Sequence, residues 1–169
     1  MVAASGRGPV ALVGAGGVGK AAAFALANLG VSELRILDSD PAKSAALVAS
    51  LPASCKAHAV ASVEDAIKGA VGLVNGTPIG MWPSTESPVP VELLHDRLWV
   101  ADAVYSPLWT PLLLAAKAAG AKVITGRELA IWQALDAFKL FSGLEPSPEV
   151  MMAAFDAVMD LRKRSGITK

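Results

Sequence analysis

Glycines recur at close spacing just after a short apolar run near the start of the chain. The run covers 10–13, the sequence Gly-Ala-Gly-Gly-Val-Gly follows at 14–19, and 20–29 has an apolar helical pattern. Gly14 permits a tight turn, Gly16 leaves the backbone open to a ligand, and Gly19 lets the helix pack closely on the strand. The first N–H groups of such a helix are unpaired and lie at its positive end. These residues therefore predict a phosphate-binding turn.

An acidic residue follows at the distance that a dinucleotide-binding site requires. Asp38 ends the predicted strand 34–37 and lies nineteen residues after Gly19, close to the ~20 expected. Its carboxylate can accept hydrogen bonds from ribose hydroxyls and would repel a 2′-phosphate, and neither Ser39 nor Asp40 is an arginine that could bind one. The residues predict NAD in preference to NADP, with Lys43 as a nearby cation that weakens the preference. The alternative is a glycine-rich turn that binds nothing.

Length and composition indicate one ordinary domain. The chain has 169 residues with 15 basic and 15 acidic side chains and no basic stripe, so nucleic acid is not a predicted partner. No apolar run reaches the ~18 residues of a membrane span, which predicts no membrane partner. Cys55 is the single cysteine, which excludes an internal disulfide and fits a cytoplasmic location. Neither His58 nor His95 has metal-ligand spacing to a partner, so no metal site is predicted.

Strand and helix patterns alternate along the whole chain. Strands are predicted at 10–13, 34–37, 55–60, 72–75, 98–102 and 122–125, with helices at 20–29, 41–51, just after Ser62, 111–119, 126–142 and 149–164. Asp40, Ser62 and Thr110 are the predicted N-caps. The alternation predicts a doubly wound six-stranded parallel sheet, a three-layer α/β/α Rossmann fold, with an added C-terminal helix. Asp102, at a strand end, is either a general base or a structural acceptor for the loop that follows.

Three further stretches follow the later strands. They are Asn-Gly-Thr-Pro-Ile-Gly-Met at 75–81, Asp-Ala-Val-Tyr-Ser-Pro-Leu-Trp-Thr-Pro-Leu-Leu at 102–113, and the segment from Gly126 through Gln133 to Phe138, Gly143 and Pro146. In this order, and together with the glycine-rich run, they resemble the shikimate/quinate dehydrogenase family over 9–155. The resemblance implies an NAD(P)-dependent oxidoreductase that transfers a hydride between nicotinamide and a ring hydroxyl of a cyclohexane or cyclohexene carboxylic acid.

The resemblance also implies site residues. Implied for the cofactor are Gly14, Ala15, Gly16, Gly17 and Val18 at the pyrophosphate, Asp38, Ser39 and Lys43 at the adenosine ribose, and Thr77, Pro78, Ala103 and Gly126 towards the nicotinamide. Tyr105 and Gln133 match the residues that reach the ring acid. Ala103 stands where relatives often have methionine. Arg127 and Glu128 depart from the smaller, often apolar residues that the family places after the glycine.

In the family an N-terminal domain binds most of the substrate and supplies a lysine and an aspartate that handle the hydroxyl proton. The resemblance therefore implies no catalytic residue in this chain, and places 1–8 as a leader or linker stub, 9–147 as the NAD-binding domain and 148–169 as a helix that packs on the N-terminal domain. The chain is expected to bind cofactor with little or no turnover, as an excised domain or a natural short relative. A homodimer through the last helix, a non-catalytic NAD sensor and a reductase of another substrate remain alternatives.

Overall fold

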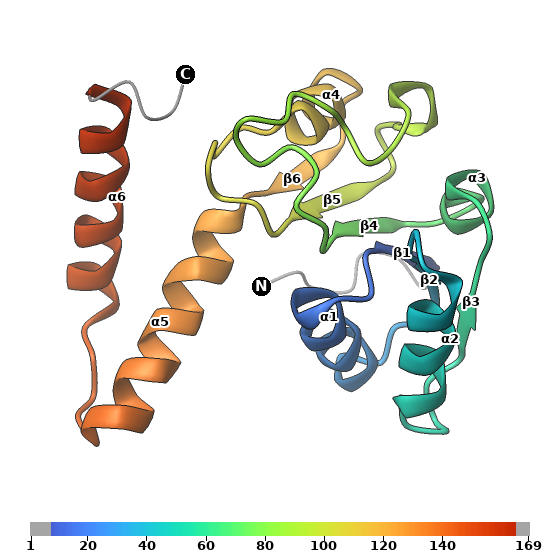
Figure 1. Cartoon of the computed structure of the whole chain (residues 1–169), viewed down its shortest axis with the longest axis horizontal. Coiled ribbons are helices and arrows are strands. Elements are labelled where there is room, and N and C mark those ends of the chain that lie inside the picture. Colours follow the sequence, from blue (N-terminus) through green and yellow to red (C-terminus); the bar gives the residue numbers. More distant parts are fainter. Residues whose placement is uncertain (1–7, 165–169) are drawn as a thin grey trace.

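The computed structural model describes residues 8–164 and has a single parallel sheet. The elements are β1 (Pro9–Val13), α1 (Gly17–Asn28), β2 (Glu33–Leu37), α2 (Pro41–Ser50), β3 (Ala57–Ala59), α3 (Val63–Ile67), β4 (Gly72–Asn75), the 3-10 helix η1 (Val91–Leu93), β5 (Trp99–Asp102), α4 (Pro111–Ala118), β6 (Lys122–Ile124), α5 (Gly126–Ser142) and α6 (Pro148–Arg164). Figure 1 shows their arrangement. The predicted six-stranded Rossmann fold is confirmed.

The strand order β3-β2-β1-β4-β5-β6 puts β1 and β4 side by side at the centre of the sheet. Every pairing is parallel, with Val10 opposite both Leu34 of β2 and Gly72 of β4. The chain therefore leaves β1 towards one edge and later returns to add β4 on the other side. Loops after β1 and β4 diverge at this point, where open α/β sheets bind their ligands.

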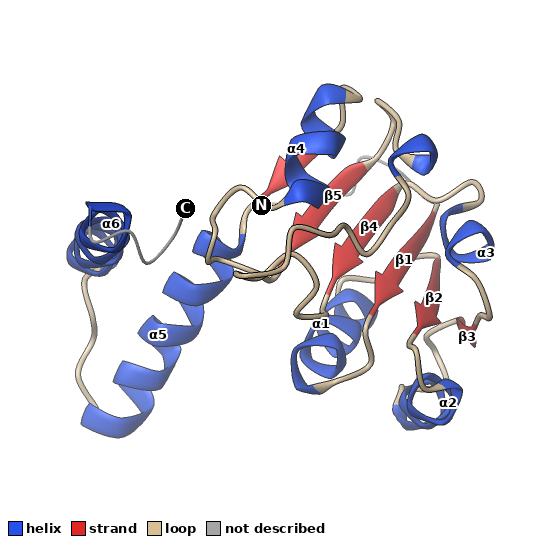
Figure 2. Ribbon diagram, turned by 45° about the horizontal axis from the view of Figure 1, so that its top comes forward, coloured by secondary structure: helices blue, strands red, loops and turns tan. Residues whose placement is uncertain are grey.

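Helices cover both faces of the sheet (Figure 2), and a separate apolar core lies on each face. On one face Leu12 and Ile36 pack with α1 and α2, and on the other Leu73 and Val100 pack with α3 and α4. All four side chains are fully buried. Burial on both faces explains why the central strand β1 reads as a continuous apolar run, whereas β2, nearer the edge, alternates apolar residues with Glu33 and Arg35.

Helices α5 and α6 do not extend the layers over the sheet. In both ribbon views α5 runs away from the carboxyl end of β6, and α6 returns beside it as the second arm of a hairpin. Gly143, with φ +70°, ends α5 in the left-handed conformation that favours glycine. Both helices were predicted, but the projecting hairpin was not. A repeat of apolar residues predicts a buried helix face without specifying which surface buries it.

Most element boundaries agree with the predictions within two residues. The predicted N-caps are confirmed, because the side chains of Asp40, Ser62 and Thr110 accept hydrogen bonds from first-turn amides of α2, α3 and α4. Two boundaries differ from the prediction. Helix α1 already begins at Gly17 inside the glycine run, and β3 is shorter because this edge strand pairs with β2 only over Ala57–Ala59.

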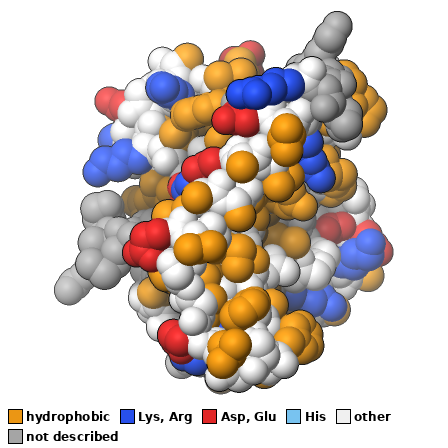
Figure 3. Space-filling model, turned by 90° about the vertical axis from the view of Figure 1, so that its left-hand side faces the viewer, with side chains coloured by type: hydrophobic (Ala, Val, Ile, Leu, Met, Phe, Trp, Pro, Cys, Tyr) orange, Lys and Arg blue, Asp and Glu red, His pale blue; other side chains and the backbone are white. Residues whose placement is uncertain are grey.

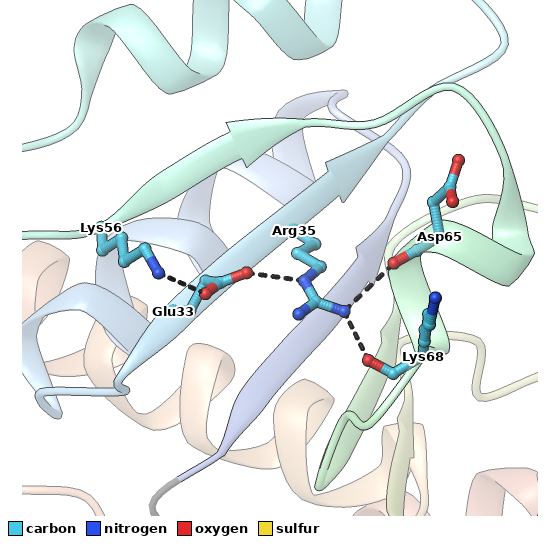
Figure 4. Close-up of polar contacts among 5 residues, drawn as sticks. All are labelled: Glu33, Arg35, Lys56, Asp65 and Lys68. Carbon is cyan, nitrogen blue, oxygen red and sulfur yellow. Dashed lines mark hydrogen bonds and ion pairs between the residues drawn. The ribbon is translucent and has the colours of Figure 1, made fainter.

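A polar network anchors α3 to the outer strands (Figure 4). The Arg35 guanidinium donates to the carbonyl oxygens of Asp65 and Lys68, at 3.1 and 2.6 Å, where α3 ends. Glu33 accepts from Arg35 at 2.6 Å and from Lys56 at 2.7 Å. These two cations hold the pKa of Glu33 at about 2. The network satisfies helix-end carbonyl groups that would otherwise lack partners.

The described residues contain neither a helix that could span a membrane nor a cluster of metal ligands. None of their helices is both long enough and apolar enough to cross a bilayer. Over 8–164, no three His, Cys, Asp or Glu side chains come together as metal ligands. The predicted leader at 1–8 lies outside the described residues except for Gly8.

Candidate functional site

The glycine-rich turn joins β1 to α1 through direct backbone contact. Gly14 has φ +99°, a left-handed conformation that disfavours any residue with a side chain. A Cβ atom at Gly19 would overlap the carbonyl oxygen of Gly14, whereas one at Gly16 or Gly17 would meet no atom within 4 Å. Gly14 and Gly19 therefore serve the fold, and Gly16 and Gly17 leave a bare backbone facing open space.

The N-terminus of α1 has no acceptor of its own. Its N-cap is Gly16, which offers no side-chain oxygen, and no acidic residue lies in the first turn. At the N-cap position of helices α2, α3 and α4, by contrast, a side chain accepts a hydrogen bond from a first-turn N–H. The positive end of α1 is therefore available to an anion, and a phosphate beside bare glycines fits this arrangement.

Asp38 is bound to the glycine turn itself. Its Oδ2 accepts from the N–H of Ala15 at 2.7 Å, and its Oδ1 accepts from the N–H of Asp40 at 2.9 Å. These bonds, the first being the larger cause, hold the pKa of Asp38 below its usual range, and the charge of Lys43 acts in the same direction. The Ser39 hydroxyl also donates to Oδ1, at 3.5 Å, whereas among the described residues Oδ2 has the Ala15 N–H as its one donor. A carboxylate oxygen has two lone pairs, so Oδ2 keeps acceptor capacity for a hydroxyl of a ligand.

Asp38 lies in a cavity of about 690 Å³ at one end of the site. Ser39 and Lys43 line the same cavity, and so do Gly14, Thr77 and Pro78. The structure therefore brings the residues predicted at the adenosine ribose together with those of the glycine turn.

A second cavity, of about 750 Å³, continues from the first. It shares Gly16, Thr77 and Pro78 with the Asp38 cavity and extends along Gly17, Val18, Ala103 and Tyr105. The two together form one groove across the carboxyl ends of β1, β2, β4 and β5. Ala15 lies beneath it, 1% exposed, and contributes through its N–H bond to Asp38.

Tyr105 and Gln133 both lie at the far end of this groove. Both line a third cavity, of about 320 Å³, with Val18 and Ala103, so it adjoins the second one. Gly126 does not line any of these three cavities. It is buried at the start of α5, where a Cβ atom would overlap the carbonyl oxygen of Val104, so its glycine is required for close packing of α5.

Asn75 holds the 76–80 loop and was missed by the sequence interpretation. Its Oδ1 accepts from the N–H and the hydroxyl of Thr77, at 3.0 and 2.7 Å, and its Nδ2 donates to Asp102 at 2.9 Å. The side chain is fully buried. A polar residue that ends an apolar strand was the signal that could have identified it.

The structure decides between the two roles considered for Asp102. Its carboxylate is 3% exposed and accepts from Asn75, from the N–H of Val104 at 3.0 Å and from the hydroxyl of Thr110 at 2.7 Å. Burial raises the pKa of this carboxyl, against the effect of those bonds. Because it is almost fully buried and both of its oxygens accept from the protein, Asp102 is a structural acceptor that fixes the 103–110 loop.

Arg162 of α6 was not identified from the sequence. It lines the second cavity and is the one charged side chain among its lining residues in the described part of the chain. No local pattern could have predicted this, because the position of Arg162 depends on how α6 folds back along α5.

No protein-family model matches the chain. It is 43% identical over 151 residues to the quinate/shikimate dehydrogenase (NAD(+)) of Corynebacterium efficiens, covering 86% of this chain and 53% of that protein. Identity to the shikimate dehydrogenase (NADP(+)) of Streptomyces avermitilis is 40% over 149 residues, covering 85% and 51%.

Solved structures give the same result. Quinate dehydrogenase from Corynebacterium glutamicum in complex with NAD superimposes with a TM-score of 0.80 at 38% identity, covering 90% of this chain and 56% of that one. Shikimate 5-dehydrogenase from Thermus thermophilus, in complex with NADP(H) and shikimate, gives 0.75 at 39% identity, covering 87% and 54%. The chain spans about half the length of the relatives it matches, and over 86% of its own length it is strongly homologous to the quinate/shikimate dehydrogenases.

Proposed function

We propose that this chain is the NAD-binding part of a quinate/shikimate-type dehydrogenase. The observation that carries the proposal is the continuous groove that links Asp38 to Tyr105 across the uncapped start of α1. A dinucleotide has the matching order of groups, with a ribose, a pyrophosphate and a second ribose in line. Gly16 and Gly17 would receive the pyrophosphate, because their backbone is bare and lies at the positive helix end.

NAD is the proposed cofactor in preference to NADP. The support is Asp38, whose lowered pKa keeps it ionised at neutral pH, so that it would accept from a free 2′-hydroxyl and repel a 2′-phosphate. Lys43 lines the same cavity and reduces that repulsion. Relatives of both kinds match the chain, so the proposal depends on these local charges.

The reaction proposed for the whole enzyme is reversible hydride transfer between nicotinamide and a ring hydroxyl of a cyclic carboxylic acid. NAD supplies the hydride acceptor when bound. Thr77, Pro78 and Ala103 would flank the nicotinamide ribose, and Gly126 would let α5 approach closely enough to meet the nicotinamide amide. Tyr105 and Gln133 would hydrogen-bond the ring acid, and their shared cavity at the end of the groove supports this.

Turnover is proposed to need a second domain, as in the family that the chain resembles. The relatives are about twice as long as the region matched here. Large hydrophobic side chains on the α5–α6 hairpin are exposed and would suit a covering domain; they include Leu140, Phe141, Leu144, Val150 and Leu161. Figure 3 shows hydrophobic side chains over this side of the molecule. The single cysteine supports a cytoplasmic location.

Calorimetric titration with NAD and NADP, on the wild type and on Asp38→Ala, tests the proposal. We expect NAD to bind more tightly than NADP, and the substitution to weaken NAD binding roughly thirtyfold, about 2 kcal/mol. Asp96→Ala, an exposed carboxylate outside the groove, is the control and should leave both affinities unchanged. Absence of NAD binding to the wild type would contradict the proposed function. Quinate- or shikimate-dependent NADH formation by the 169 residues alone would contradict the need for a second domain.

A further inference from the structure

Arg127 forms a two-point contact with α6. Its Nε and Nη2 donate to the two carboxylate oxygens of Asp156 at 2.8 and 2.7 Å, which joins the start of α5 to the middle of α6. The pair raises the pKa of Arg127 and lowers that of Asp156. A planar guanidinium bound at two points fixes orientation as well as distance.

Phe155, the residue before Asp156, links Arg127 to the groove because it contacts both Arg127 and Tyr105. The Arg127 guanidinium carbon lies 6.0 Å from the ring centroid of Phe155, within the range of a cation–π contact. Phe155 also contacts Tyr105, with ring centroids 6.2 Å apart and an interplanar angle of 65°, an edge-to-face contact. Arg127, Phe155 and Tyr105 are thus connected in series.

Tyr105 depends on this support more than a core residue would. It is 45% exposed and belongs to the 103–110 loop, so its side chain is not enclosed by the core. Phe155 is the aromatic partner found for it among the described residues. The orientation of the ring at the groove wall therefore depends on the position of α6.

We propose that Arg127 and Asp156 are positioning residues that, through Phe155, hold the ring of Tyr105 at the groove wall. The proposal rests on the proposed function, in which Tyr105 contacts the ring acid. It also assigns a role to Arg127, where the resembled family has smaller residues. Its neighbour Glu128 has a separate local contact, since it accepts from the Thr125 hydroxyl at 2.7 Å at the start of α5. Exposed ion pairs add little to stability. The effect proposed for the Arg127–Asp156 pair is therefore on the orientation of the Tyr105 ring.

The test uses the fact that Tyr105 is the only tyrosine in the chain. Tyrosine labelled with ¹³C in the ring gives a single set of NMR signals that reports the ring current of Phe155. Phe155→Leu should move those signals by the full ring-current contribution. Asp156→Asn should move them part of the way to the Phe155→Leu position, and Asp156→Glu should return them towards the wild type.

Glu145→Gln is the matched control. It breaks an ion pair of 2.6 Å with Lys139 on the same hairpin, away from Tyr105, and should leave the Tyr105 signals unmoved. The midpoint of urea unfolding should be the same for Asp156→Asn and the wild type, which separates positioning from a general loss of structure. Unmoved Tyr105 signals in Asp156→Asn, or in Phe155→Leu, would overturn the proposal. Failure of NAD to bind the wild type would instead count against the proposed function, because the tyrosine signals are measured without a ligand.

Discussion

Asp38 and Asp102 occupy similar places in the fold and have opposite surroundings. Each stands at the carboxyl end of a parallel strand, Asp38 directly after β2 and Asp102 as the last residue of β5. Asp38 accepts from two backbone N–H groups and, at 3.5 Å, from the Ser39 hydroxyl, but it is only half-buried and lines an open groove. The protein surrounds Asp102 with three donors and buries it. The role of an acidic residue at a strand end is therefore ambiguous until its burial is known.

The largest effect is expected from removing the buried carboxylate. Asp102→Ala leaves Asn75, Val104 and Thr110 with donors that have lost their acceptor inside the core, so the free energy of unfolding should fall by about 3 kcal/mol. Urea unfolding followed by circular dichroism measures this. Asp102→Asn, which keeps one acceptor oxygen, should lose less. If both variants are as stable as the wild type, the assigned structural role is wrong.

A smaller effect should separate the two aspartates by function. Asp38→Asn should weaken NAD binding about tenfold and improve binding of NADP relative to NAD, because the charge that repels a 2′-phosphate is gone. Its free energy of unfolding should change by less than about 1 kcal/mol, since Asp38 is only half-buried. Asp102→Asn should show the reverse, with NAD affinity within about twofold of the wild type at temperatures where it is folded. Equal loss of NAD binding in both variants would break the comparison.

The smallest effect is the opposite pH dependence of the two groups. The folded pKa of Asp38 is lowered, so its contribution to stability is present above about pH 4 and is lost as the pH falls towards the folded pKa. The folded pKa of Asp102 is raised, so the folded state binds the extra proton and stability decreases as the pH rises above about 4. The free energy of unfolding should be measured from pH 3 to 7. Asp38→Asn should abolish the increase of stability with pH that Asp38 causes, and Asp102→Asn should abolish the decrease that Asp102 causes. If the two substitutions change the pH dependence of stability in the same direction, the opposite pKa shifts assigned to Asp38 and Asp102 are wrong.

The fold could be predicted from the sequence because its signals are local. Apolar runs, caps such as Thr110 and the glycine turn each depend on a few consecutive residues, and the structure confirms the elements that they predict. The groove residues from Gly14 to Tyr105 also come together as expected, since strand ends in a parallel sheet share one edge. What these residues bind stays a prediction.

The rest could not be predicted because it depends on contacts between distant segments. Asn75 and Asp102 are 27 residues apart, and only the β4–β5 pairing brings them together. Arg127 and Asp156 are 29 residues apart and meet because α6 folds back along α5. The sequence can mark Asn75 and Asp102 as polar residues that end apolar strands, but it does not show which partners they or Arg127 and Asp156 have. Their roles follow from tertiary geometry, for which no short pattern exists.

The position of β1 at the centre of the sheet has a consequence for synthesis on the ribosome. Of the six strands of this sheet, β1 is synthesised before the others, but one of its edges is paired only when β4 has emerged, some sixty residues later. Until then the nascent chain can form β1, β2 and β3 with one unpaired apolar edge, the kind of surface that other chains or chaperones bind. The groove cannot form before that time either, because the loops after β1 and β4 line its centre. Because of this strand order, the pairing of β4 with β1 covers the open edge of the sheet and also brings together the two strand ends at the centre of the groove.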